Sequence, residues 1–192
     1  MDGKPPLNVR LAVTAVFAAL IAIGTFFSIP APQPLYEITW SPAIYLALAV
    51  LADSGTAFSA TAIGGFIGEA INITYKGGSP IYPFGMVWAR GPEVLIVVWG
   101  ARKGGKWLAI SMVLATVFET LAFFFPDWAF YAYGLFQYQV TSGSTPLALA
   151  AFDFGTLVDV VWIPVAFGII YAAGPAFRRL GFQTKLQELK QA

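Results

Sequence analysis

Long apolar segments constrain the fold of this chain more than any other feature of its sequence. A helix needs about 20 apolar residues to cross a hydrocarbon core of about 30 Å. The expected spans are 11–29, 40–52, 56–73, 81–100, 107–125 and 147–173. We therefore predict an all-α integral membrane bundle of about six transmembrane helices, with residues 1–192 forming one transmembrane domain.

Composition agrees with this class of protein and excludes several functions. The chain is 58% hydrophobic and 11% charged, with a mean hydropathy of +0.71, so it lacks the polar surface of a soluble domain. A net charge of +1 argues against nucleic acid as a partner. The absence of Cys and His excludes disulfides, thiolate zinc sites and imidazole chemistry. We predict no catalytic residue, cofactor or resident metal, although carboxylate-bound metals stay open.

The distribution of basic residues predicts the orientation of the bundle. With six spans, only Lys76 among the basic residues falls on the outer side. Arg90 lies within the fourth span, and the remaining basic residues fall on the inner side together with both termini: Lys4, Arg10, Arg102, Lys103, Lys106, Arg178, Arg179, Lys185 and Lys190. Because cytoplasmic loops carry an excess of Lys and Arg, we expect cytoplasmic N- and C-termini in a multi-pass protein of a prokaryotic cell membrane.

Polar residues within the apolar segments are the candidates for function. A charge at the bilayer centre costs about 2.5–3.5 kcal/mol on insertion scales unless it faces a partner or a cavity. Glu119 lies in the fifth span, and further polar residues lie in the third, fourth and sixth: Glu69, Asn72, Arg90, Glu93, Asp153 and Asp159. They predict a polar pocket buried among helices, in contact with a substrate.

Spacing suggests how these residues pair. Arg90 and Glu93 are three apart and could form an ion pair within one helix, which would be only a structural bridge, while Gly91-Pro92 between them should kink that helix. Glu69 and Asn72 share a helix face. Along an α-helix, the spacing of six between Asp153 and Asp159 puts them on different parts of the surface, which weighs against a metal-dependent membrane enzyme.

Two other segments have alternative interpretations. Prolines between residues 28 and 42 exclude a continuous helix, so Tyr36, Glu37 and Trp40 could form a lid over a pocket or anchor the chain at the membrane interface. In the first span, Ala15, Ala19 and Ala22 belong to a series of small residues that allows close helix approach. That series could pack inside the bundle or dock a separate subunit.

The chain resembles the substrate-binding membrane subunits (S components) of energy-coupling-factor (ECF) vitamin transporters. The resemblance covers nearly the whole chain and is carried by RLAVTAVFAALIAIG in the first span, GGFIGEAIN in the third and WARGPEVLIVVWGARKGG closing the fourth. It implies that Ala15, Ala19 and Ala22 dock a transmembrane coupling subunit driven by two ATPase subunits. It also implies an outward-facing vitamin pocket that includes Tyr36, Glu37, Trp40, Glu93, Phe152, Asp153 and Asp159.

The excess of acids over Arg90 within the spans favours a cationic ligand, and aromatic side chains could stack on a flat ring with about 0.5–2 kcal/mol of cation–π attraction. Thiamine or its pyrimidine precursor fits best. The nickel/cobalt branch of the family lacks support because its amino-terminal histidine signature is absent. The alternative is a standalone proton- or cation-coupled carrier that uses Glu69, Glu93 or Asp159 as a proton relay. No GxxxxGK[ST] loop is present, so any ATPase must be another subunit.

Overall fold

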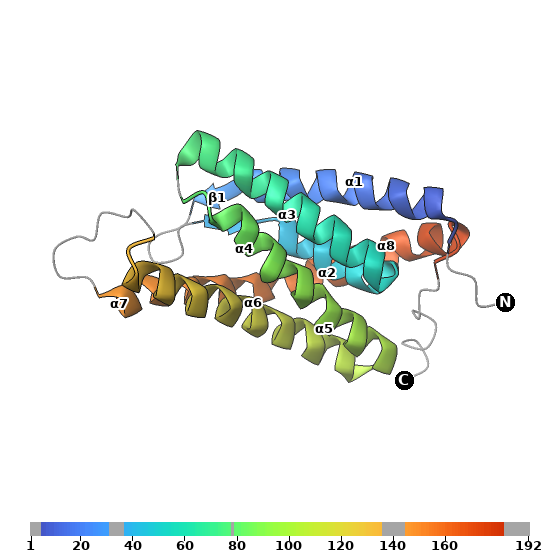
Figure 1. Cartoon of the computed structure of the whole chain (residues 1–192). Coiled ribbons are helices and arrows are strands. Elements are labelled where there is room, and N and C mark those ends of the chain that lie inside the picture. Colours follow the sequence, from blue (N-terminus) through green and yellow to red (C-terminus); the bar gives the residue numbers. More distant parts are fainter. Residues whose placement is uncertain (1–4, 31–36, 78, 136–144, 183–192) are drawn as a thin grey trace.

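The computed structural model describes residues 5–30, 37–77, 79–135 and 145–182, and this part of the chain is mostly helical (Figure 1). The helices are α1 (Leu7–Phe26), α2 (Ser41–Leu51), α3 (Ser54–Lys76), α4 (Tyr82–Trp88), α5 (Arg90–Lys103), α6 (Lys106–Ala132), α7 (Pro146–Ala150), the 3₁₀ helix η1 (Ala151–Trp162) and α8 (Ile163–Arg179). A short antiparallel hairpin of β1 (Ser28–Pro30) and β2 (Glu37–Thr39) pairs Ile29 with Ile38. The prediction of a helical protein is confirmed.

Three helical segments are long and apolar enough to cross a membrane. They are Leu7–Phe26, Lys106–Ala132 and the continuous run Pro146–Arg179 that joins α7, η1 and α8. α2 is a shorter apolar helix, and α3 has the required length but carries Glu69 and Lys76 in its second half. These findings agree with a membrane protein.

Two proline positions set where the helices break. The expected kink of the fourth span falls at Ala89, between α4 and α5, one turn before Pro92, whose ring would clash with the preceding turn. The fifth span was expected to end at residue 125, but α6 continues through Pro126 to Ala132. Pro126 cannot donate to the Ala122 carbonyl, and the indole Nε1 of Trp88 does so instead at 3.1 Å, so the helix continues.

Close approach of α1 and α3 depends on glycine. A Cβ at Gly64 would lie 2.5 Å from the Ala18 carbonyl oxygen, and one at Gly68 would lie 2.7 Å from that of Ala22. Ala18 and Ala22 are accordingly buried. Part of the small-residue series in the first span therefore packs within the bundle, as small-xxx-small contacts do.

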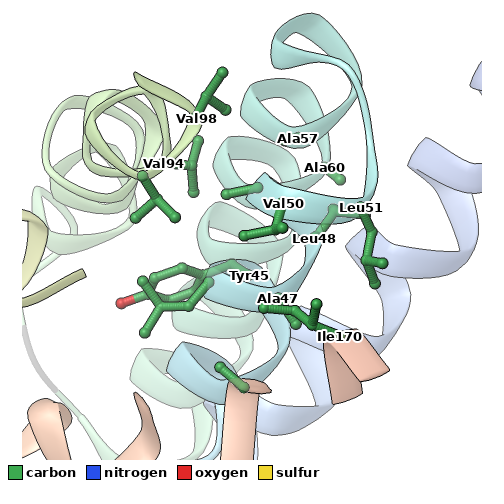
Figure 2. Close-up of a cluster of buried hydrophobic side chains, with 14 of the residues drawn as sticks. Tyr45, Ala47, Leu48, Val50, Leu51, Ala57, Ala60, Val94, Val98 and Ile170 are labelled. Atoms are coloured by element: carbon green, nitrogen blue, oxygen red, sulfur yellow. The ribbon is translucent and has the colours of Figure 1, made fainter. Parts of the chain in front are cut away.

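α2 lies at the centre of the apolar core. Leu46, Leu48 and Leu51 are fully buried and pack with residues of α3, α5 and α8. Figure 2 shows this cluster, with Tyr45 at its edge and the Tyr45 hydroxyl directed out of it. α2 therefore carries a polar group from the apolar core toward the remaining helices.

The bundle has two chemically different ends. α1 begins and α8 ends at the same end (Figure 1), where Pro5 Cα lies 3.8 Å from the position of a Cβ at Gly181. We call it the basic end, because the described part of the chain places these residues in its terminal turns: Arg10, Arg102, Lys103, Lys106, Arg178 and Arg179. The β-hairpin and the C-terminal end of α3 lie at the opposite end, the hairpin end (Figure 1).

Candidate functional site

Four helices bring ionisable side chains together inside the bundle. Arg90 at the start of α5 donates from Nε to Oε1 of Glu119 on α6 at 2.7 Å, and both side chains are buried. The Tyr45 hydroxyl of α2 donates to Glu119 Oε2 at 3.3 Å, and Arg90 Nη1 donates to Ser41 Oγ at 2.9 Å. Glu119 therefore receives hydrogen bonds from two helices and links α2, α5 and α6.

Two further acids face this ion pair. Glu93 is fully buried one turn after Arg90, and Asp159 on η1 is 5% exposed. Both interact electrostatically with Glu119 and Arg90. We call Tyr45, Arg90, Glu93, Glu119 and Asp159 the Arg90 cluster. Its three acids and one guanidinium give an excess of two negative charges when all are ionised.

Arg90 and Glu93 do not form the ion pair that their spacing in the sequence allowed. Arg90 pairs with Glu119, and neither oxygen of Glu93 has a hydrogen-bond partner among the described residues. The spacing of three allows a contact within a helix, but α6 offers Arg90 a carboxylate that Tyr45 also holds in place. The tertiary partner replaces the local one.

The 3₁₀ geometry of η1 changes how the acids of the last span are arranged. Three residues per turn place residues i, i+3 and i+6 on one face, so Asp153, Thr156 and Asp159 are aligned, with Trp162 following them. The other sides of η1 carry exposed apolar residues, with Phe154, Leu157 and Val160 in one row and Val161 in the other. The expectation that Asp153 and Asp159 lie on different parts of the helix surface is wrong, because it assumed α-helical periodicity.

A pair of tryptophans adjoins the Arg90 cluster. The ring centroids of Trp40 and Trp162 are 4.6 Å apart with the planes at 45°. Trp40 directly precedes Ser41, which is bonded to Arg90, and Trp162 follows Asp159 by one 3₁₀ turn. Trp40 is 46% exposed and Trp162 is 8% exposed, and the buried Trp162 Nε1 has no acceptor among the described residues.

A second acidic contact joins α4, α6 and η1. Tyr82 Oη donates to Asp127 Oδ2 at 2.9 Å, and the carboxyl groups of Asp127 and Asp153 lie within hydrogen-bonding reach of each other. Two adjacent carboxyl groups repel each other when both are ionised, so a shared proton would stabilise this contact. Thr120 and Thr156 hydroxyls, 2.6 Å apart, link α6 to η1 between this pair and the Arg90 cluster.

The remaining predicted binding residues lie elsewhere. Glu69 and Asn72 share a face of α3 as predicted, with Asn72 Nδ2 donating to Glu69 Oε2 at 3.5 Å. Phe152 is partly buried on η1. Tyr36 and the side chain of Glu37 lie outside the described residues.

Sequence reasoning left several partners out of the predicted binding residues: Ser41, Tyr45, Tyr82, Glu119, Asp127 and Trp162. Glu119 carried a usable signal, since it is the lone acid within an otherwise apolar stretch of the fifth span. Ser41 and Tyr45 carried none, because hydroxyl residues are common in apolar helices. The positions of all six depend on contacts between helices.

The alanines predicted to dock a subunit are divided between two environments. Ala15 and Ala19 are exposed on α1, among the exposed apolar residues Leu11, Val16, Leu20 and Ile23. Ala22 is buried against Gly68 of α3. The outer face of α1, which includes Ala15 and Ala19, is therefore apolar and exposed. It can contact lipid or another helix.

At the basic end, Asp53 caps α3 by accepting from the backbone N–H groups of Gly55 and Thr56. Arg10 of α1 donates to the same carboxylate from Nε and Nη2, both at 3.0 Å. Burial opposes ionisation, but the hydrogen bonds from Thr56 and Arg10 outweigh it and hold the pKa of Asp53 below its ordinary value. This contact ties α1 to α3 outside the apolar core.

No protein-family model, curated protein or solved structure matches the chain.

Proposed function

We propose that the chain is the S component of an ECF-type importer, which captures a cationic vitamin or related small molecule from outside the cell. The observation that carries the proposal is the Arg90 cluster, where three acids surround one guanidinium beside the Trp40–Trp162 pair. A cationic ring could stack on tryptophan while the surplus carboxylates neutralise its charge. Thiamine or its pyrimidine precursor has this chemistry.

The arrangement of the chain supports this assignment. An even number of crossings returns α8 to the end where α1 begins, and the basic residues of that end indicate that it is cytoplasmic. Six spans, built from α1, α2, α3, α4 with α5, α6, and α7 through α8, then place Trp40 and the β-hairpin on the outer side. Asp127 and Asp153 also lie toward that side.

Transport requires partners in this proposal. The chain has no ATPase motif, so a transmembrane coupling subunit and two ATPase subunits would supply the driving force. Ala15 and Ala19 on the exposed face of α1 would contact the coupling subunit, while Ala22 serves the contact between α1 and α3.

A standalone proton-coupled carrier is the second candidate. It is favoured by the contact between Asp127 and Asp153, which a shared proton would stabilise and from which that proton could be exchanged during transport. Both candidates would bind ligand in purified form, so binding alone does not separate them.

Reconstitution of the purified chain in liposomes distinguishes the two candidates. We expect labelled thiamine to bind the protein but not to accumulate in the liposomes under a pH gradient, and uptake to appear only with an ATP-driven coupling module. The matched control is Glu93→Gln, which should lose binding and ATP-driven uptake together. Accumulation driven by the pH gradient alone would replace the S-component proposal with the carrier.

A further inference from the structure

Glu93 is a buried acid whose negative charge, when it is ionised, is not neutralised by the rest of the Arg90 cluster. Its side chain is fully buried, and neither carboxylate oxygen has a hydrogen-bond donor among the described residues. An ionised carboxylate without water or donors is strongly disfavoured, and such groups become neutral in practice. The geometry therefore demands a cation or a proton at this carboxylate.

Arg90 is not hydrogen-bonded to Glu93 and does not act as the cation at this carboxylate. Its Nε is bonded to Glu119 and its Nη1 to Ser41. The groups that face Glu93 are Tyr45 from α2, Arg90 from its own helix, Glu119 from α6 and Asp159 from η1. Within the described part of the chain, the Tyr45 hydroxyl is the one neutral donor near Glu93, but its single proton is directed to Glu119 Oε2 at 3.3 Å and neither oxygen of Glu93 receives it. The other two neighbours are acids, which oppose a further negative charge.

We infer that Glu93 is a proton-binding site in the ligand-free protein, at which a bound proton stands in for a cation. Glu93 then stays neutral beside the ion pair of Arg90 and Glu119. The cluster loses one of its two surplus negative charges. The inference requires neither a vitamin ligand nor an ATPase, and it therefore holds independently of the proposed function.

Infrared spectroscopy of the full chain in lipid at neutral pH tests the proton site. The carbonyl stretch of a protonated carboxylic acid is separate from the bands of an ionised carboxylate and shifts in heavy water. We expect the wild type to show two such components, one from Glu93 and one from the contact of Asp127 with Asp153. Glu93→Gln should remove the first alone, and Asp153→Asn should remove the second alone.

Asp53→Asn is the matched control, because it replaces an acid by its amide at the basic end and should leave both components unchanged. A wild-type spectrum whose only protonated component disappears in Asp153→Asn would overturn the inference. An unchanged spectrum in Glu93→Gln would do the same. Gln has nearly the shape of protonated Glu, so failure of Glu93→Gln to fold would also count against a neutral Glu93.

Discussion

Arg90 and Glu119 form an ion pair across α5 and α6 in which Nε and Oε1 are 2.7 Å apart and both side chains are withdrawn from solvent. The pair lies 29 residues apart in sequence and is completed by Tyr45 and Ser41 of α2. A buried pair with these added hydrogen bonds fixes the relative positions of three helices. Glu93 and Asp159 are held next to it without sharing its hydrogen bonds to Arg90.

Replacement of Glu119 by Gln should destabilise the protein by about 3–5 kcal/mol, because it leaves the Arg90 guanidinium buried without its counter-charge. Thermal unfolding in detergent measures the effect. The same change at Glu93 should lower the unfolding temperature little, since Glu93 receives no hydrogen bond. Equal losses in the two variants would show that Glu93 is an ionised partner of Arg90.

Replacement of Trp40 by Ala should weaken thiamine binding by roughly 2- to 30-fold, the range equivalent to about 0.5–2 kcal/mol of cation–π attraction. Titration calorimetry of the purified chain gives the affinity. The control is Trp107→Ala, which removes a tryptophan that packs on Trp99 near Lys103 at the basic end. If both variants bind thiamine as the wild type does, the tryptophan pair lies outside the binding site.

Substitutions at two adjacent alanines of α1 distinguish docking of a subunit from packing within the bundle. Ala18→Leu should destabilise the bundle by about 1–3 kcal/mol through overpacking against Gly64, whose own Cβ position is already 2.5 Å from the Ala18 carbonyl oxygen. Ala19→Leu should leave the unfolding temperature and thiamine affinity unchanged but abolish ATP-driven uptake. Normal uptake by a folded Ala19→Leu variant would remove this face from the docking surface.

Asp53 should make stability depend on acidic pH. Its folded-state pKa is below the unfolded value, which is about 3.9. Its contribution is therefore complete above that value and is lost as the pH falls through the folded-state pKa. Asp53→Ala should cost about 0.5–2 kcal/mol at neutral pH through the lost cap, and its unfolding temperature should approach that of the wild type below about pH 4. A constant difference across this range would contradict the assignment.

The parts of the fold that depend on local chemistry were predictable. The unbroken apolar run of α1 and the capping of α3 by Asp53 follow from neighbouring residues. Continuation of α6 through Pro126 was not predictable, because its free carbonyl at Ala122 is bonded by Trp88, 34 residues away. A local signal for a break was outweighed by a partner from another helix.

The candidate site was likewise predictable only in part. The presence of charged residues within apolar segments of the sequence predicted Arg90, Glu93 and Asp159 as candidate site residues. Their partners could not be assigned, because spacing within one helix favoured Glu93 for Arg90 and gave no information about Glu119. The alignment of Asp153 with Asp159 depends on the 3₁₀ winding of η1, which the apolar pattern does not distinguish from an α-helix.

The most direct test of ligand capture is native mass spectrometry of the purified protein, with thiamine, its pyrimidine precursor, riboflavin, biotin and folate offered separately. We predict a stable adduct with thiamine or the pyrimidine that Glu93→Gln loses and Asp53→Asn retains. Retention of biotin or folate, with no adduct of either cationic compound, would contradict a site built from surplus carboxylates around Arg90.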